Sequence, residues 1–291
     1  MNQRPESAIL RTRPAAWTRF ARHRGAMAGA IMLLVLAAAA LLTPLISPFS
    51  YDEVLWDRIG QSPDIASGHI MGTDFVGRDV FVRTMLGLAV SLVVGLSAAA
   101  VSVLIGAAYG AIAGYAGGAT EQIMMRIVDG LFAIPFMFVV ILVMVVFGRN
   151  FFLLFVAIAA IQWLTMARIT CAQTRILRQR GFIIAAELAG LHPALVIIRH
   201  IAPNLGGLIV IYLTLTIPEI ILIESFLSFL GMGVQEPLTS LGVLISEGAK
   251  EIYTAPWLLA APVVTLTTCL ISLNLIGDGL RSALDPKDAS P

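Results

Sequence analysis

Charged residues are scarce in this 291-residue chain: only 13% of its residues are Asp, Glu, Lys or Arg, whereas 58% are hydrophobic. A typical soluble domain has about 25% charged residues, so a soluble fold of this size would have too few of them to cover its surface. The mean hydropathy of +0.89 points the same way. The composition therefore excludes an ordinary soluble protein and predicts one integral membrane domain that crosses the bilayer several times.

The sequence also lacks the motifs of catalysis and nucleotide binding. It contains no G-x-x-x-x-G-K-[ST] phosphate loop, no H-E-x-x-H zinc motif and no serine nucleophile elbow. Its histidines are scattered, and its cysteines have no partner at metal-site spacing: His23, His69, His192, His200, Cys171 and Cys269. We therefore expect that this chain has no catalytic residue, binds no metal, cofactor or ATP by itself, and has no nucleic-acid partner.

Long apolar runs take the place of these motifs. A helix needs roughly 20 mostly apolar residues to cross a bilayer. Six stretches qualify: Ala26–Ser47, Leu86–Tyr115, Gly130–Gly148, Phe151–Ala167, Leu205–Leu230 and Trp257–Ile276. None of them alternates as a barrel strand would, so we predict an all-α integral membrane protein with six transmembrane helices. The third and fourth stretches are joined only by Gly148-Arg149-Asn150, which favours a tight hairpin.

The first stretch follows a basic segment and could be mistaken for a secretory signal peptide. The apolar region of a signal peptide is about 7–15 residues long, whereas this one is longer and begins only after residue 25. An uncleaved first helix is therefore expected.

Lys and Arg are divided unevenly between the two sides of the membrane. Fourteen of the 19 fall on the side that would hold both termini, and the positive-inside rule places that side in the cytoplasm. The expected map is a basic cytoplasmic tail (1–25), a first membrane helix (26–47), an extracytoplasmic loop (48–85), a five-helix core (86–280) and a cytoplasmic tail (281–291). Within the core, residues 168–204 form a cytoplasmic loop and residues 231–256 an extracytoplasmic one.

The segment Phe182–Asn204, which we call the elbow, is unusually amphipathic for so apolar a chain. Its sequence predicts a helix, a break at His192-Pro193, and a second helix that ends at Pro203. The small residues Ala185, Ala186 and Gly190 would let another backbone approach closely. Docking to a soluble partner and lying flat on the lipid headgroups account for the pattern equally well.

Two carboxylates interrupt the fifth apolar stretch. Glu219 and Glu224 are costly in hydrocarbon and are expected to face a cavity or a partner. Lining a pathway and serving as structural fixtures are equally consistent with the sequence. Pro218 precedes Glu219 and predicts a non-uniform helix.

The second stretch holds three glycines at four-residue spacing, Gly106, Gly110 and Gly114. Glycines on one helix face allow another helix to approach closely. The partner helix could belong to this chain or to another subunit.

The elbow resembles the cytoplasmic coupling loop of ABC-importer permeases, whose central motif is E-A-A-x-x-x-G. The matching positions are Ile184, Ala185, Ala186 and Gly190, so isoleucine stands where the motif has its glutamate. Glu187 is nearby and is expected to point elsewhere on the helix.

The end of the elbow and three further stretches resemble the peptide-transport branch of that family. The elbow ends in an R-H-x-x-P-N pattern, from Arg199-His200 to Pro203-Asn204. The other stretches are GTDFVGRDVFVR (Gly72–Arg83), ESFLSFLGMGVQEP (Glu224–Pro237) and NLIGDGLRSALDP (Asn274–Pro286), the last with Ser282 in place of a common Asp. Four motifs in order identify the chain as similar to the DppC/OppC-type permease subunits of dipeptide and oligopeptide ABC importers in the peptide/nickel family.

This resemblance implies a type I ABC importer permease fold with both termini in the cytoplasm. It implies a DppB/OppB-like second permease, two cytoplasmic ATPases that bind ATP and Mg²⁺, and an extracytoplasmic solute-binding protein. The residues that it assigns to ATPase coupling are Ala185, Ala186, Gly190, His200, Pro203 and Asn204.

Peptide is the cargo that the resemblance favours, although relatives carry nickel, glutathione or other solutes on the same scaffold. A stand-alone secondary transporter with Glu219 or Glu224 as its proton site is a rival interpretation. Such folds usually have internal repeats, and no second half of this sequence echoes the first. A membrane scaffold without a pathway is a third interpretation, and the coupling loop speaks against it.

Overall fold

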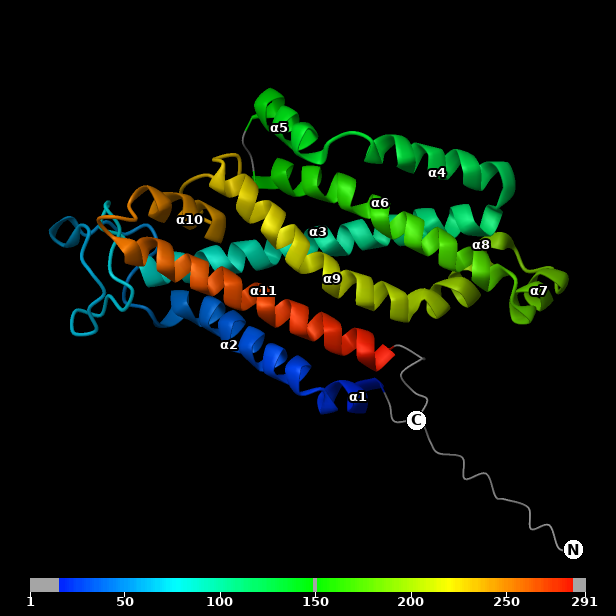
Figure 1. The fold of residues 1–291 in the computed structure, drawn as a ribbon, viewed down its shortest axis with the longest axis horizontal. Coiled ribbons are helices and arrows are strands. Elements are labelled where there is room, and N and C mark those ends of the chain that lie inside the picture. The colour runs from blue at the N-terminus through cyan, green and yellow to red at the C-terminus, as the bar shows by residue number, and fades with distance from the viewer. Residues whose placement is uncertain (1–15, 149–150, 285–291) are drawn as a thin grey trace, which may run out of the picture.

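The computed structural model describes residues 16–148 and 151–284, and within them the chain is helical with no named strand. Five helices of the described residues are long and apolar enough to cross a membrane. They are α2 (Arg24–Ile46), α3 (Val80–Ala116), α6 (Phe151–Arg178), α9 (Ala202–Phe229) and α11 (Pro256–Leu284). They lie lengthwise in an elongated bundle (Figure 1). The expectation of an all-α, multi-span membrane protein is confirmed.

The bundle has two different ends. One end, which we call the loop end, carries residues 47–79, the 3-10 turn Trp56–Arg58 and the short helix α10 (Leu241–Lys250). The other, the elbow end, carries α7 (Gly181–Leu188) and α8 (Pro193–Val196). A short helix, α1 (Ala16–Arg22), precedes α2 and packs on α11.

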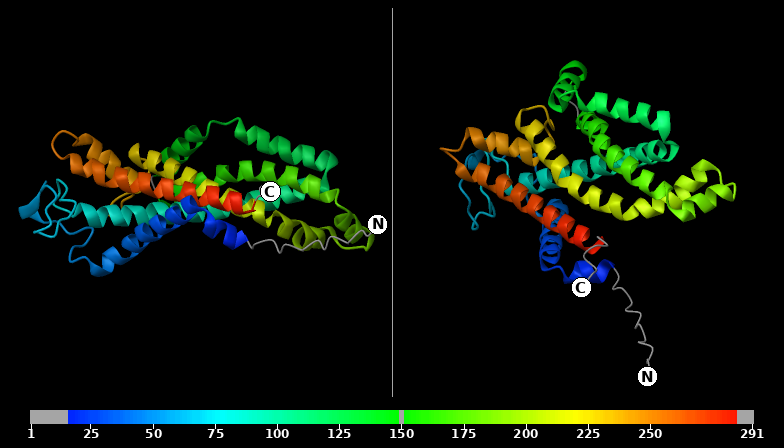
Figure 2. Two further views of the ribbon diagram at one scale, coloured as in Figure 1. Left: turned by 60° about the horizontal axis from the view of Figure 1, so that its bottom comes forward. Right: turned by 45° about the vertical axis from the view of Figure 1, so that its right-hand side comes forward.

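The third apolar stretch is not the continuous helix that the sequence predicted. The chain forms α4 (Gly118–Phe132) and α5 (Phe136–Phe147), which are bent by 73° against each other. The bend falls at Pro135, whose ring disfavours the helical conformation for Ile134. The pair lies at the edge of the bundle, as the green ribbons in both views of Figure 2 show. The described residues thus contain five continuous candidate spans, and the predicted number of six is reached only if this bent pair crosses the membrane as one.

Several helices run past the predicted ends of their spans. The helix α3 begins at Val80, inside the loop that the sequence placed at 48–85, and α6 continues past Ala167 to Arg178. The apolar run of a sequence marks only the part of a helix that fits in hydrocarbon, and the same helix can extend into water on polar residues. The hairpin predicted at Gly148, Arg149 and Asn150 lies largely outside the described residues, as do the ends of both tails.

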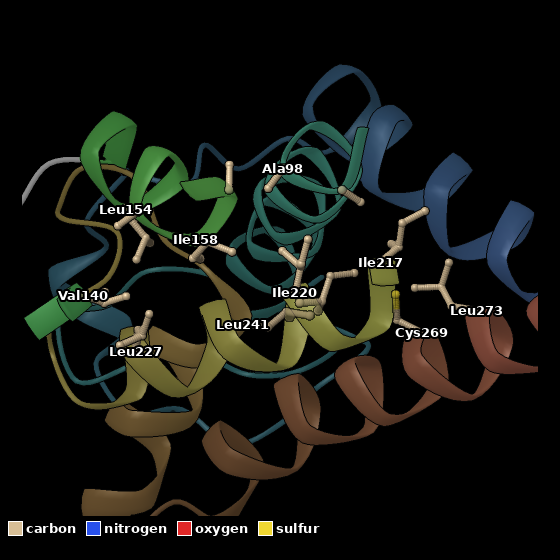
Figure 3. Packing of buried hydrophobic residues seen from close by; sticks show 14 of the residues in the cluster. Ala98, Val140, Leu154, Ile158, Ile217, Ile220, Leu227, Leu241, Cys269 and Leu273 are labelled. Atoms are coloured by element: carbon tan, nitrogen blue, oxygen red, sulfur yellow. The ribbon is translucent and has the colours of Figure 1, made fainter. Parts of the chain in front are cut away.

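The core lies where α3, α6, α9 and α11 meet. Ala98, Ile158, Ile220, Leu227 and Cys269 are each 0% exposed and belong to one cluster. Figure 3 shows these side chains pointing towards one another from the facing helices. The cluster has members from all five long helices, including Ala40 of α2, so this contact fixes the bundle.

The glycine stripe of α3 is used inside the chain. A Cβ on Gly106 would lie 2.5 Å from the carbonyl oxygen of Trp163, and one on Gly114 would lie 2.5 Å from that of Cys171. A Cβ on Gly110 would likewise clash with the backbone of Ala167. The stripe is therefore the surface on which α6 approaches α3, which decides between the two possibilities that the sequence left open.

Candidate functional site

The elbow begins with α7, at the right-hand end of the bundle in Figure 1. This helix ends in a Schellman motif, in which the N–H of Leu191 donates to the carbonyl of Ala186 at 3.2 Å and the N–H of Gly190 donates to that of Glu187 at 3.0 Å. Gly190 has a φ of +79°, which glycine adopts without strain. The glycine therefore sets the turn that redirects the chain.

The second half of the elbow differs in part from the prediction. The break before α8 is confirmed, and the side chain of His192 caps the new helix. The predicted end at Pro203 is wrong, because α8 passes through a π-helical turn (Ile197–Ile201) directly into α9. The ring of Pro203 would crowd a regular α-turn, and the wider turn, in which the N–H of Ala202 reaches the carbonyl five residues back, accommodates it. The elbow is thus continuous with a membrane helix.

One apolar face of the elbow is buried on the bundle. Ile183, Val196 and Ile201 of the elbow are 0% exposed and pack with Ala111 of α3. Burial of several aliphatic side chains on one neighbour stabilises the position of both halves of the elbow.

The opposite face of the elbow carries apolar side chains that the described chain leaves uncovered. Ile184 is 45% exposed, Leu188 84%, Leu195 53% and Ile198 67%. We call these four side chains the elbow patch. Exposed apolar groups gathered in one place are typical of a surface that contacts a protein or a membrane.

The six residues assigned to coupling by resemblance are divided between the two faces. Ala186 is only 8% exposed, and His200 is partly buried. The other four are exposed: Ala185, Gly190, Pro203 and Asn204. Ala186 therefore helps α7 to pack on its own bundle, whereas the described chain leaves the other four uncovered.

A cleft of about 520 Å³ opens beside the elbow patch, between α7 and the ends of α3 and α6. Its lining includes Ile184 and Glu187 together with the charged side chains of Glu121, Arg175 and Arg178. Arg175 forms an ion pair with Glu121. Residues three apart lie on the same helix face, so Glu187 faces the cleft beside the position where the motif has its glutamate. The expectation that Glu187 points elsewhere is wrong.

The two carboxylates of α9 lie in opposite environments. Glu224 is 0% exposed. Its carboxylate accepts hydrogen bonds from Ser91 of α3 at 2.9 Å and from Ser228 at 2.7 Å. Glu219, in contrast, is exposed on the surface of the described chain. The same type of residue therefore serves as an internal connection at one position and remains available to a ligand or partner at the other.

Pro218, next to Glu219, does not break α9. The helix runs continuously from Ala202 to Phe229 with Pro218 buried inside it. The prediction of a non-uniform helix at Pro218 is therefore wrong, and the irregular turn of this region lies before α9, at Ile197–Ile201.

A network of ion pairs organises the loop end. Arg83, 4% exposed in the first turn of α3, binds Asp74 at 2.7 Å and Glu247 of α10 at 2.8 Å. Arg78 binds Asp74 at 2.9 Å and Glu236 at 2.9 Å. Burial opposes the charge on Arg78, yet the carboxylates of Glu236 and Asp74 raise its pKa above the usual value. The network joins α3 and α10 to the loops that precede them, residues 47–79 and 230–240.

A second contact closes the same loop. His69 is 0% exposed, stacks on Phe49, and lies 2.7 Å through Nδ1 from the carboxylate of Asp79. Asp79 also caps α3 by accepting from the N–H of Val82. From the sequence, His69 was interpreted as one of four unrelated histidines. The ten positions between His69 and Asp79 give no local pattern that would predict their contact.

The chain matches two family models. Residues 106–288 match the binding-protein-dependent transport system inner membrane component family. Residues 15–63 match the N-terminal TM domain of oligopeptide transport permease C.

Individual relatives agree with the family models. The chain is 50% identical over 270 residues to the oligopeptide transport system permease protein OppC of Escherichia coli (strain K12), an alignment that covers 93% of this chain and 89% of the relative. It is 40% identical over 273 residues to the dipeptide transport system permease protein DppC of Bacillus subtilis (strain 168), with coverage of 94% and 85%. The resemblance found in the four motifs is thereby confirmed. The chain belongs to the binding-protein-dependent transport system inner membrane component family, as a non-catalytic, multi-pass permease subunit of the inner membrane.

Proposed function

We propose that the chain is the permease subunit of an ATP-driven importer that carries dipeptides or oligopeptides, with both termini in the cytoplasm. Its partners are a DppB/OppB-like second permease, two ATPases that bind ATP and Mg²⁺, and a solute-binding protein on the other side. The names of the relatives support peptide as the cargo. The fourteen Lys and Arg residues on the side of the termini and the elbow support the orientation.

The observation that carries this proposal is the two-faced elbow. One face is fixed to α3 through buried side chains such as Ile183 and Val196. The other presents the elbow patch, where Leu188 is 84% exposed. An amphipathic helix of this kind fits the groove of a soluble partner. The exposed residues Ala185, Gly190, Pro203 and Asn204 would complete the docking surface, together with the partly buried His200.

The continuity of the elbow with α9 gives docking a mechanical consequence. Because α8 runs without a break into α9, a displacement of the elbow by an ATPase is carried along a membrane helix. At its far end, α9 is linked to α3 through Glu224 and Ser91. Movement at the elbow can therefore reach both helices at the opposite end of the bundle.

The test is the substitution Leu188→Arg in the complete transporter. Leu188 contributes little to the fold, because most of its surface is exposed, whereas a charge there would oppose docking into an apolar groove. Ile65→Arg is the matched control, since Ile65 is also 84% exposed but lies at the loop end. The readouts are co-purification of the ATPases and ATP-dependent uptake of a labelled oligopeptide into proteoliposomes.

We expect L188R to lose both the ATPases and uptake, and I65R to keep the ATPases. Normal ATPase recovery and uptake by L188R would overturn the assignment of the elbow. A wild-type chain that purifies without a second permease or ATPase would instead favour the stand-alone secondary transporter.

A further inference from the structure

Glu219 lies deep in the membrane span of α9. It is ten residues before Phe229, the last residue of the helix, and so about 15 Å from that end at 1.5 Å per residue. At that depth lipid offers no hydrogen bond, and a carboxylate there faces a cavity, water or a partner. The requirement is specific to Glu219, because the buried Glu224 is already satisfied by serine hydroxyls.

The side chain of Glu219 is directed away from the core of its own bundle. It falls on the same stripe of α9 as Leu215, Leu222 and Phe226, which are 37%, 51% and 49% exposed. Helix positions three and four apart share a face, so this stripe is a surface of α9 that the described chain does not cover.

Polar groups of α6 gather on the same side. Tyr212 lies seven residues before Glu219, on the same face of α9, and its side chain interacts with Thr165 of α6, with Thr216 and with the charge of Glu219. Gln162 lies three residues before Thr165 and therefore on the same face of α6. Its Nε2 is buried without a hydrogen-bond partner in the described structure. We call Gln162, Thr165, Tyr212 and Glu219 the polar stripe.

The charge of the polar stripe selects the kind of ligand. It holds one carboxylate, and α9 contains no Lys or Arg between Ala202 and Phe229. The hydroxyl oxygens of Thr165 and Tyr212 add acceptors. An ammonium group has one positive charge and three donors, and it matches this arrangement of one negative charge with several acceptors.

We propose that Glu219, together with Thr165 and Tyr212, forms a subsite of the translocation pathway that binds the protonated amino terminus of a peptide. The inference rests on the proposed function, because a free amino terminus is the cation that unmodified peptides share. The apolar side chains above and below, Leu215 and Leu222, leave the rest of the peptide without specific contacts. Glu219 thus recognises a common end and tolerates varied side chains.

The test measures peptide binding to the permease–ATPase complex itself, in nanodiscs and without the solute-binding protein. The probes are radiolabelled trialanine and N-acetyl-trialanine; acetylation removes the positive charge at the amino terminus and adds one small acetyl group there, and Glu219→Gln separates the two effects. The variants are Glu219→Gln, which removes the charge at nearly constant volume, and Glu219→Asp, which keeps it. Co-purification of the second permease shows that each variant still assembles.

We expect the wild type to bind trialanine about tenfold more tightly than the acetylated peptide, the size of one charge-assisted hydrogen bond. E219Q should bind trialanine more weakly and the acetylated peptide as before, so that the two affinities become equal. E219D should retain the difference between them. Equal binding of both probes by the wild type, or no binding of either, would overturn the subsite, as would an equal loss of both in E219Q. Loss of the second permease in E219Q would assign Glu219 to the subunit interface instead.

The same preparation separates this proposal from the proposed function. ATP-dependent uptake of trialanine by the wild-type complex, supplied with its solute-binding protein, tests the importer. If uptake occurs while binding ignores acetylation, the subsite is wrong and the importer stands. If the wild type shows no uptake at all, the importer itself fails.

Discussion

The guanidinium of Arg83 lies 2.8 Å from the carboxylate of Glu247, and this pair joins the first turn of α3 to α10 across 164 positions of the chain. The same guanidinium binds Asp74 at 2.7 Å. Arg83 and Asp74 are 4% and 9% exposed in their side chains, whereas Glu247 is 38% exposed. The inner half of the network is therefore shielded from water and the outer half is not.

The first prediction follows from this asymmetry. Arg83→Met should destabilise the protein by about 1.5–3 kcal/mol, because it removes a charge-assisted hydrogen bond to the buried carboxylate of Asp74, which then keeps only Arg78 as its cation. Glu247→Gln should cost about 1 kcal/mol or less, because water screens an exposed pair. Thermal unfolding of the purified variants in detergent checks the order. Equal shifts for the two variants would contradict it.

The second prediction concerns the contact of α3 with α6. Gly110→Ala should destabilise the protein by about 1–3 kcal/mol, because the new Cβ would press on the backbone of Ala167. Gly130→Ala on α4 is the control, since a Cβ there meets nothing within 4 Å and should stabilise the helix by about 0.5–1 kcal/mol. Both changes are read from thermal unfolding. A harmless G110A would mean that α6 does not approach α3 as closely as described.

Composition was enough to predict the membrane spans, because a helix in hydrocarbon must be apolar over most of its length. It could not predict the bend in the third span. Pro135 is one residue in an otherwise apolar stretch, and hydropathy carries no information on helix direction. The Arg83–Glu247 pair was also beyond the sequence, since nothing local links two residues so far apart.

The two glutamates of α9 show why the site was only partly predictable. In the sequence, Glu219 and Glu224 give the same signal, a carboxylate in an apolar run. Five residues rotate a helix by about 500°, which places the two side chains about 140° apart around its axis. One therefore meets the serines of the core and the other leaves the bundle. Only the packing of α9 against α3 and α10 determines that Glu224 is the buried carboxylate and Glu219 the exposed one.

The third prediction tests what Gly190 does. Its φ of +79° is needed for the turn after α7, and a Cβ there would meet nothing within the chain. Asn adopts this conformation more readily than other residues with a side chain, so Gly190→Asn should retain most ATP-dependent uptake. Gly190→Val should lose it, because a β-branched residue is strained there. Gly190→Arg should also abolish uptake, by adding bulk and charge beside the elbow patch.

The control for this series is insertion of each variant in the membrane, measured as the amount of assembled permease. If G190N were inactive although fully assembled, the glycine would be needed for close approach of the ATPase and not for the turn.

The last prediction assigns Glu224 a structural role. Glu224→Ala removes the acceptor of Ser91 and Ser228 and leaves a cavity between α3 and α9, which should cost about 2–5 kcal/mol. Glu224→Gln keeps the volume and one carbonyl acceptor, so it should lose less stability and retain uptake. Because the carboxyl is 0% exposed and its oxygens are occupied by hydroxyl donors, it should not exchange protons during transport. The pH profile of uptake in E224Q should therefore have the shape of the wild-type profile, and a profile that became flat would show that Glu224 is a proton site.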